Sequence, residues 1–516
     1  MKQLSRLAAL GLALCLILSG CTVEDEPEPA DPSEPPAPVI VTQAPEAVRF
    51  SLGYDPAASL DPIAGDSQVN QELTGLVYQY LYQLDNTFAP QPCLASDAVV
   101  SGDGYTWTFT IAAGVLFSDG TPLTAEHAAA SLNAARSSPL YETRLANIWS
   151  VYTVDEQTMV VGLSAPNGNL PTLLDIPVTL PQEEGPPLGS GYYRYEPSGE
   201  RMFLQANPYH PSAAALPYTA IPLTEISAAA ERIAAFDSGE ITAVTTDFTS
   251  PYSLGYSSSY ESWDYPTTNL LYVGFQASAG PCQSPLVRRA FSRAFNRAEL
   301  VEVLLSGHGD AAELPVSPLC GEWDEGAAAL LRFDLEDAAA LLDEAGYALS
   351  EEDGLRYRDR EPLAVTLVVN SDNDSRQAVA DALASALTGL GVTVTVERLS
   401  WNDYTAALQE GRFDLYIGET RLTGDFDPST LLTGALNYGY FEDWALTQAL
   451  WDWQGAQGDD RALAAKTLWE TFAQDAPFAP LCFKRGSMLV RWGLVSDLTP
   501  TRADPYFRME RWTMAG

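Results

Sequence analysis

The chain has 516 residues, with 28 Lys and Arg against 68 Asp and Glu, and its formal net charge is −40. Hydrophobic residues make up 46% and aromatic residues 10%, so the sequence is not a disordered acidic chain and is long enough for two or three domains. Because phosphate binding needs clustered Lys and Arg, the charge argues against nucleic acid as a partner. Three histidines leave little room for a His-based metal centre, and we expect neither a metal nor a cofactor.

Residues 1–20 are predicted to be a lipoprotein signal peptide. Lys2 and Arg6 precede the apolar stretch Leu7–Leu18, which is shorter than the roughly 20 residues that a membrane span requires. The stretch leads into Leu18-Ser19-Gly20-Cys21, which resembles a bacterial lipobox. That resemblance implies lipid attachment to the Cys21 thiol and cleavage before it. The alternative is an ordinary signal peptide followed by a chance cysteine.

Residues 21–46 are predicted to be a solvated tether. Residues 22–46 contain seven prolines and seven acidic residues, with no Lys or Arg, and such a composition cannot bury apolar area. We therefore expect a protein that is anchored by lipid to the outer face of the cytoplasmic membrane of a bacterium and does not cross that membrane.

The first half of the body contains three predicted elements. Leucine, valine and tyrosine recur at helical spacing over Gln71–Leu84, which predicts an amphipathic helix. Tyr105–Ile111 alternates as a strand does, and Thr124 can cap a helix over Ala125–Ala135.

The second half gives a clearer α/β signal. Leu363–Val369 is a β-rich run, and Asp372 or Asp374 can cap the apolar-faced helix that follows it. Gly391 ends this helix, and Val392–Val396 alternates as a second strand. This order is a βαβ unit and implies parallel pairing through a right-handed crossover.

A further helix over Trp401–Glu410 and a strand over Phe413–Ile417 come next. In open parallel sheets, ligands lie beyond the carboxyl ends of the strands. The predicted loop 418–428 is therefore a candidate binding loop.

Seven stretches, in order, resemble the family 5 extracellular solute-binding proteins of ABC importers, the oligopeptide- and dipeptide-binding group. They are Ser59-Leu60-Asp61-Pro62, Phe117–Glu126 within 102–132, Gly189-Ser190-Gly191-Tyr192-Tyr193, Asn207-Pro208-Tyr209, Val287-Arg288-Arg289-Ala290, Asn296-Arg297 and Ala340–Tyr347. The match covers roughly residues 50–512.

The resemblance implies an α/β fold of the periplasmic-binding-protein type, with two lobes that close on a hinged cleft and an extra subdomain in the first lobe. Lobe I would combine 47–72, 187–267 and 485–516, and the extra subdomain would be 73–186. Lobe II would be 268–484. The hinge strands would cross near Thr267–Asn269 and Phe483–Arg485.

Asp425 is the main candidate for ligand binding. In peptide-binding relatives an aspartate at the matching position pairs with the terminal ammonium of the ligand, and a charge-assisted bond of this kind is short and strong. The alternative is that Asp425 only stabilises a turn before Asp427-Pro428.

Four further residues are candidate ligand contacts. Arg421 is predicted either to receive a carboxylate from a short peptide or to form a structural ion pair with Glu419. Trp401 and Tyr404 either line the cleft or belong to the core, because their spacing also suits a buried helix face. Leu422 stands where the family frequently has a tryptophan.

These features predict a membrane-anchored, monomeric binding protein that captures peptides, with oligopeptides as the favoured class, and delivers them to ABC permease subunits. The alternatives are the same fold binding a nickel chelate, an opine or a sugar, and a peptide-signal receptor that is not coupled to transport. No Gly-x-Ser-x-Gly, His-Glu-x-x-His or P-loop pattern occurs, so we expect no catalytic residue and no enzyme activity. The four body cysteines are expected as free thiols, and a disulfide between Cys282 and Cys320 is the alternative.

Overall fold

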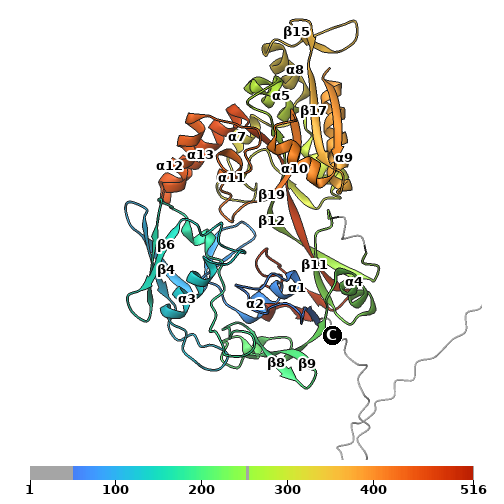
Figure 1. Ribbon diagram of the computed structural model, residues 1–516. Helices are drawn as coiled ribbons and strands as arrows, with labels where there is room; N and C mark the ends of the chain where they lie inside the picture. The colour runs from blue at the N-terminus through green and yellow to red at the C-terminus, as the bar shows by residue number, and fades with distance from the viewer. Residues whose placement is uncertain (1–49, 251–254, 515–516) are drawn as a thin grey trace, which may run out of the picture. The chain divides into compact units, whose positions relative to one another are not determined.

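The computed structural model describes residues 50–250 and 255–514, and the predicted signal peptide, Cys21 and the tether lie outside them. The described chain combines helices with several sheets (Figure 1). The largest sheet has seven strands, in the order β11-β20-β12-β19-β17-β18, with β13 paired to β20. Its strand β11 is Ala243–Thr246, and β13 is Gly309–Ala311. Two four-stranded sheets have the orders β4-β5-β7-β6 and β1-β10-β9-β8. The strands of the second are β1 (Leu52–Tyr54), β10 (Ala220–Glu225), β9 (Arg201–Ala206) and β8 (Tyr193–Ser198).

The predicted βαβ unit is present in the largest sheet. Strand β17 (Ala364–Asn370) leads into α9 (Asp374–Gly389), and β18 (Thr393–Leu399) pairs with β17 in parallel. The predicted cap is wrong in detail: Asn373, between the two aspartates, caps α9 by accepting from the backbone N–H of Arg376.

Helices cover both faces of the central strands of this sheet, and successive strand residues point alternately to one helical layer and to the other. Leu270 and Tyr272 pack with α10 (Trp401–Gln409), α12 (Trp444–Gly455) and α13 (Gly458–Asp475). Leu271 and Val273 pack with α9 and with α5 (Pro285–Ala294) and α8 (Leu335–Glu344). The two hydrophobic clusters hold β12, β17 and β19 between two helical layers.

Two long antiparallel strands run through the centre of the chain (Figure 1). Their bounds are Tyr260–Phe275 for β12 and Phe478–Arg491 for β20. The register between them shifts between Pro266 and Leu270, so the regular ladder is interrupted at the position where the sequence predicts a hinge crossing. The motion of two lobes about this point remains a prediction.

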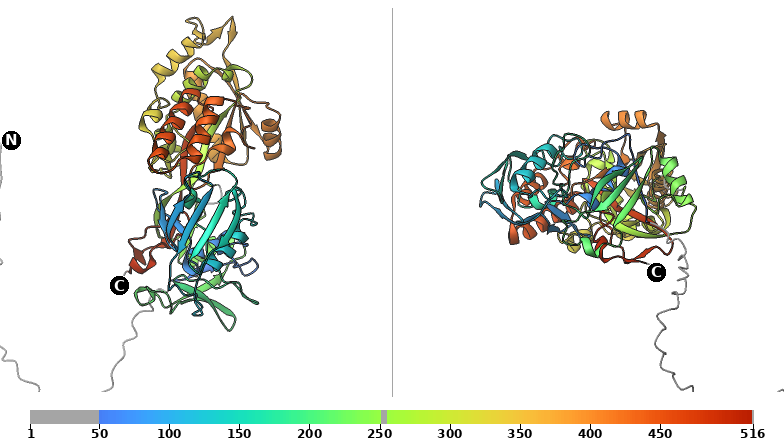
Figure 2. Two further views of the ribbon diagram at one scale, coloured as in Figure 1. Left: turned by 90° about the vertical axis from the view of Figure 1, so that its left-hand side faces the viewer. Right: turned by 90° about the horizontal axis from the view of Figure 1, so that it is seen from below.

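A separate antiparallel sheet lies in the segment 73–186. Its strands are β4 (Ala95–Val100), β5 (Thr106–Ile111), β6 (Ile148–Thr153) and β7 (Thr158–Leu163), which lie side by side in Figure 2. The predicted helix α3 (Ala125–Ala135) packs on this sheet. Its first turn is closed by His127, whose Nδ1 accepts from the backbone N–H of Thr124 at 3.1 Å.

The predicted helix over Gln71–Leu84 is wrong. The structure has two single-turn helices, α1 (Gln68–Gln71) and α2 (Thr74–Val77), followed by an extended chain and strand β2 (Tyr82–Leu84). The apolar residues of this segment are buried on several sides, so their helical spacing does not mark a single face. Gly75 of α2 packs closely against Asp504, because a Cβ atom added at Gly75 would lie 2.3 Å from the Asp504 carboxylate.

The described residues contain no helix with both the length and the apolar character needed to cross a membrane. Cys93, Cys282, Cys320 and Cys482 are free thiols, which agrees with the expectation from the sequence.

Candidate functional site

Strand β19 (Leu415–Arg421) places the candidate residues, and it is longer than the sequence predicts. Its residues from Leu415 to Arg421 pair with β12 from Phe275 to Asn269. The predicted loop 418–428 is therefore wrong at its start, because residues 418–421 are strand. The strand ends where Leu422 donates its N–H to the carbonyl of Thr268 at 3.0 Å and accepts from the Thr268 hydroxyl at 2.7 Å.

Two adjoining cavities lie beside the end of β19. One has a volume of about 460 Å³ and the other about 390 Å³. They share five lining residues: Gln71, Leu140, Arg421, Arg502 and Ala503. We call the two cavities together the central cleft.

The two cavities differ in their other walls. The first includes Asp247 and Tyr265 and reaches Arg485 of β20. The second includes Leu422, Thr423 and Gly424 from the loop after β19, together with Arg144 and Asp175 from the segment 73–186. The central cleft is thus bounded by segments far apart in the sequence.

A third cavity, of about 440 Å³, lies between α5, α8 and α9. Its walls are mostly aliphatic and aromatic, and Glu299 is its one charged lining residue. The central cleft combines aromatic groups with the polar and charged groups that orient a solute, and we therefore place the candidate site there.

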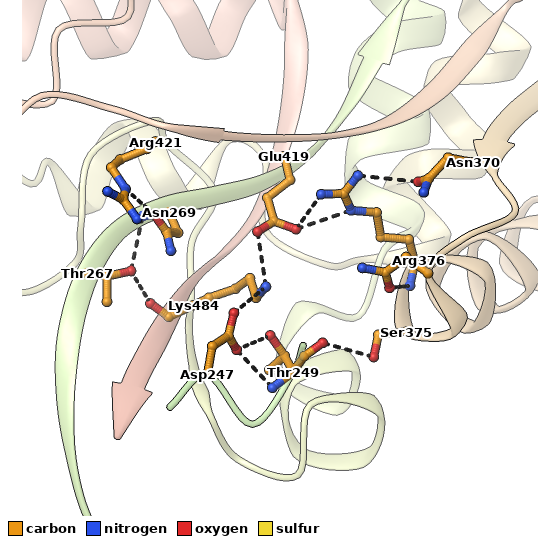
Figure 3. Close-up of polar contacts among 11 residues, drawn as sticks. Asp247, Thr249, Thr267, Asn269, Asn370, Ser375, Arg376, Glu419, Arg421 and Lys484 are labelled. Carbon is orange, nitrogen blue, oxygen red and sulfur yellow. Dashed lines mark hydrogen bonds and ion pairs between the residues drawn. The ribbon is translucent and has the colours of Figure 1, made fainter. Parts of the chain in front are cut away.

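Arg421 lies at the junction of the two cavities and does not pair with Glu419. Its Nε donates to Asn269 Oδ1 at 3.1 Å, as Figure 3 shows. Glu419 instead accepts from Arg376, at 3.1 Å from Nε and 2.9 Å from Nη2, and from Lys484 Nζ at 3.0 Å. The predicted alternative of an Arg421–Glu419 ion pair is therefore wrong, because two other cations hold Glu419.

Lys484 extends this network behind the cleft. Its ammonium also pairs with Asp247 at 2.9 Å, and only 6% of its side chain is exposed (Figure 3). Burial opposes its charge, but Glu419 and Asp247 outweigh that effect and raise the pKa of Lys484. The ion pair of Lys484 with Glu419 links β20 to β19 across β12, which lies between them in the sheet.

Asp425 follows the cleft-lining residues Thr423 and Gly424 but does not itself line either cavity. Its Oδ1 accepts from the Thr423 hydroxyl at 2.6 Å and, at 3.4 Å, from the N–H of Asp427. Burial, together with the negative charge of Asp427, raises the pKa of the Asp425 carboxyl. The turn contact predicted as the alternative role is thus present, and binding of an ammonium stays a prediction.

The two aromatic candidates on α10 have different environments. Tyr404 is 4% exposed and donates its hydroxyl to the carbonyl of Ile417 at 2.6 Å, so its proposed place in the cleft wall is wrong and the core alternative holds. Trp401 is 52% exposed and lies against Tyr404, with ring centroids 5.7 Å apart. Trp401 lines neither cavity of the central cleft.

Several cleft residues were not predicted. Arg144, Asp175 and Arg502 form a compact group in the second cavity, and Asn269 orients Arg421. No motif marks them, since they come from distant segments. Among residues 50–250 and 255–514, no group of three or more His, Cys, Asp and Glu side chains is arranged to hold a metal ion.

Comparison with known proteins identifies the family. The model of the bacterial extracellular solute-binding proteins, family 5, matches residues 89–441. The oligopeptide-binding protein AppA of Bacillus subtilis is 21% identical over 484 residues, which cover 86% of this chain and 87% of AppA. The glutathione-binding protein GsiB of Salmonella typhimurium is 25% identical over 406 residues, covering 72% of this chain and 74% of GsiB.

A solved structure supports the same fold. The periplasmic murein tripeptide-binding protein MppA, in its unliganded open form, superposes with a TM-score of 0.74 at 18% identity, covering 91% of this chain and 98% of MppA. The chain belongs to the family 5 bacterial extracellular solute-binding proteins and has their two-lobed α/β fold.

Proposed function

We propose that this protein captures peptides outside the cell and delivers them to an ABC importer. The observation that carries the proposal is the central cleft, which lies at the end of β19 and is walled by distant segments of the chain. The names of the relatives AppA, GsiB and MppA, which refer to an oligopeptide, glutathione and a murein tripeptide, favour a peptide. In this proposal the protein binds and releases its ligand and performs no chemical step.

Asp425 is the proposed partner of the ligand's terminal ammonium. Both of its described hydrogen bonds reach Oδ1, and two neighbouring residues of its loop line the cleft. Burial and Asp427 disfavour its ionised form, and a ligand ammonium would offset that penalty. Peptide binding would then draw Asp425 toward the cleft and favour the closed form by its higher affinity for that form.

The proposed location follows from the N-terminal sequence. Lipid attached at Cys21 would hold the protein at the outer face of the cytoplasmic membrane, and residues 21–46 would space the binding domain from it. The monomeric protein would then present its loaded form to the permease subunits.

A small anionic solute, such as a metal chelate or an opine, is the second candidate. The second cavity has three arginines and one aspartate among its lining residues, which favours negative charge in a solute. A sugar and a role in peptide sensing without transport receive no specific support from the cleft.

The test begins with native mass spectrometry of the purified protein, to identify any ligand that copurifies. Peptides with free and N-acetylated amino termini are then compared by thermal shift, in the wild type and in Asp425→Asn. We expect acetylation or the substitution to remove most of the shift. Asp381→Asn, an exposed change on α9, is the matched control and should leave the shift unchanged.

Equal shifts for free and acetylated peptides would contradict the role of Asp425 but not peptide capture. A copurified ligand that is not a peptide, with no shift from any peptide, would contradict peptide capture. Uptake of a bound peptide by cells with and without this protein separates transport from sensing.

A further inference from the structure

A loop of the segment 73–186 touches the turn between α12 and α13. The N–H of Gly168 in this loop donates to the carbonyl of Gln454, near the end of α12, at 2.9 Å. A Cβ atom added at Gly168 would lie 1.7 Å from the carbonyl oxygen of Ala456, so the two backbones are in direct contact and only glycine fits there. Two segments far apart in the sequence thus form a close backbone contact.

A second hydrogen bond extends this contact. Gln457, in the turn between α12 and α13, donates from Nε2 to the carbonyl of Ser101 at 3.2 Å. The loop that holds Gly168 is itself fixed, because the indole N–H of Trp107 donates to the carbonyl of Asn167 at 2.9 Å. We define the clasp as the contacts of Gly168 and Ser101 with Gln454, Ala456 and Gln457.

The two sides of the clasp belong to different hydrophobic cores. Leu170 and Leu173, which follow the Gly168 loop, pack with the sheet of β4, β5, β6 and β7. On the other side, Leu450 of α12 packs with Leu422 of the loop after β19. Phe88 adds an apolar contact between the same two bodies. The clasp therefore joins the body built on the segment 73–186 to the body that carries the candidate binding loop.

Gln454 connects the clasp to the candidate binding loop. Its carbonyl accepts from Gly168, and its Nε2 donates to Asp427 Oδ2 at 2.8 Å and to Ser429 Oγ at 2.9 Å. Asp427 in turn donates its N–H to Asp425 Oδ1 at 3.4 Å. A movement at the clasp is therefore transmitted to the loop that contains Asp425.

The second cavity of the central cleft lies between the same two bodies. Thr423 and Gly424 line it from the body that carries the binding loop, and Arg144 and Asp175 line it from the segment 73–186. When the clasp is closed, these walls face each other across the cavity. When the clasp opens, they separate.

We infer that the clasp retains the solute: it closes when a solute fills the central cleft and opens to release it. The segment 73–186 then has a function of its own, and Gln454 is a positioning residue for the binding loop. The hydrogen bonds of the clasp contribute little net free energy because water replaces them on opening, so a solute that contacts both bodies decides between the two states. The inference rests on the proposed function only in placing a solute in the central cleft.

The first test measures how fast a peptide leaves. A pool of tri- to pentapeptides made from Ala, Leu, Phe and Ser is screened by thermal shift against the full chain, and the rate constants of the strongest binder are measured by surface plasmon resonance. In Gly168→Ala the added methyl group holds the clasp apart. We expect dissociation to be about 10-fold faster and association to stay within about 2-fold of the wild type.

Gly102→Ala is the matched control in the same segment, because a Cβ atom at Gly102 would meet no atom within 4 Å. This variant should leave both rate constants unchanged. Equal dissociation rates for Gly168→Ala and Gly102→Ala would overturn the inference while peptide capture stands.

The role of Gln454 is tested separately. Gln454→Met keeps the backbone bond to Gly168 but loses the side-chain bonds to Asp427 and Ser429, so the binding loop is held less firmly. We expect the peptide to dissociate about 3- to 10-fold faster. Gln448→Met, at an exposed position of α12, is the matched control. A wild-type dissociation rate in Gln454→Met would contradict its positioning role.

A reversible cross-link tests closure directly. A Cβ atom at Gly455 would lie 3.5 Å from the Cβ of Pro166, a separation that suits a disulfide. After the double variant Pro166→Cys with Gly455→Cys has bound the peptide and been oxidised with diamide, we expect it to retain the peptide through dialysis and to lose it on reduction. The two single variants control for the native thiols. Equal loss from the oxidised and the reduced complex would overturn the clasp.

A last measurement needs no ligand. After any copurified ligand has been removed by dialysis, the reduced double variant should have a larger radius of gyration in small-angle X-ray scattering than the oxidised one. Equal radii would show that the clasp does not open and would overturn the inference. If no peptide binds, peptide capture is contradicted, and the scattering comparison alone supports or overturns the clasp.

Discussion

Phe88 and Phe426 pack edge to face across the chain, with their ring centroids 4.6 Å apart and their planes at 79°. Phe88 lies in the turn between β2 and β3 (Pro90–Pro92), and Phe426 lies in the loop after β19. Phe426 also meets Phe483 of β20, with centroids 5.2 Å apart. This aromatic row joins the segment 73–186 to the candidate binding loop and to a central strand.

The contact between Phe88 and Phe426 should be visible in a double-mutant cycle. We expect each change to alanine to reduce the free energy of unfolding by about 3–5 kcal/mol, because both rings are buried. Urea unfolding should give a coupling of about 0.5–1.5 kcal/mol between them. The control cycle pairs Phe88 with Phe472, which contacts Phe478, and should be additive. Additivity in both cycles would contradict the contact.

The backbone conformation of Phe88 predicts that glycine is more stable than alanine at this position, whereas alanine is usually the more stable of the two. Its φ angle is 63°, in the left-handed region that favours glycine. We expect Phe88→Gly to be about 1 kcal/mol more stable than Phe88→Ala. Within helix α13, Phe472→Gly should instead be about 1 kcal/mol less stable than Phe472→Ala. The same order at both positions, measured by urea unfolding, would show that Phe88 does not have this backbone conformation.

Glu419 should be important for stability because it holds two cations. In Glu419→Gln, Arg376 and Lys484 lose their shared counter-charge in a largely buried network. We expect the free energy of unfolding to fall by about 3 kcal/mol. The exposed pair of Asp381 with Arg398 is the control, and Asp381→Asn should cost less than about 1 kcal/mol. Equal costs for the two variants would mean that the network contributes no more than a surface pair.

Asp504 predicts a pH dependence of stability. Its carboxyl is 2% exposed, and burial raises its pKa to about 7. The folded state therefore binds a proton more tightly than the unfolded state, so stability is greatest below about pH 4 for this group and falls as the pH rises to about 7. In Asp504→Asn this loss should disappear.

Urea unfolding at pH 5 and pH 8 measures the difference. We expect Asp504→Asn to gain roughly 2 kcal/mol relative to the wild type between these two pH values. Asp237 is the control, because hydrogen bonds from Ser257 and Ser258 lower the pKa of its carboxyl to about 2. Asp237→Asn should therefore leave the pH dependence of the free energy of unfolding above pH 5 unchanged. If Asp504→Asn loses as much free energy of unfolding between pH 5 and pH 8 as the wild type does, the raised pKa of Asp504 is contradicted.

The sequence predicts the βαβ unit well because its signals are local. The β-rich run of β17, the apolar face of α9, the left-handed Gly391 with φ 84° and the alternation of β18 all lie within about 40 residues. The end of β19 was missed because its last residues are polar, and their pairing partner β12 lies some 150 residues earlier. Local periodicity does not contain that information.

The cleft itself was predicted only in part. Arg421 was found because it follows the predicted end of a strand at Ile417, but its neighbours Arg144 and Arg502 are some 280 and 80 residues away. Tyr404 was ambiguous because helical spacing is the same for a core residue and for a cleft residue. Its burial depends on packing against β19, which the helix sequence alone does not specify.

The most direct test of solute capture in the central cleft is a crystal structure of the protein with its copurified ligand or with the strongest peptide from the screen. We predict that the ligand lies in the central cleft, with a carboxylate within hydrogen-bonding distance of Arg421 and an amino group beside Asp425. A ligand bound in the cavity between α5, α8 and α9, or one that leaves Arg421 without an acidic partner, would contradict the proposed site.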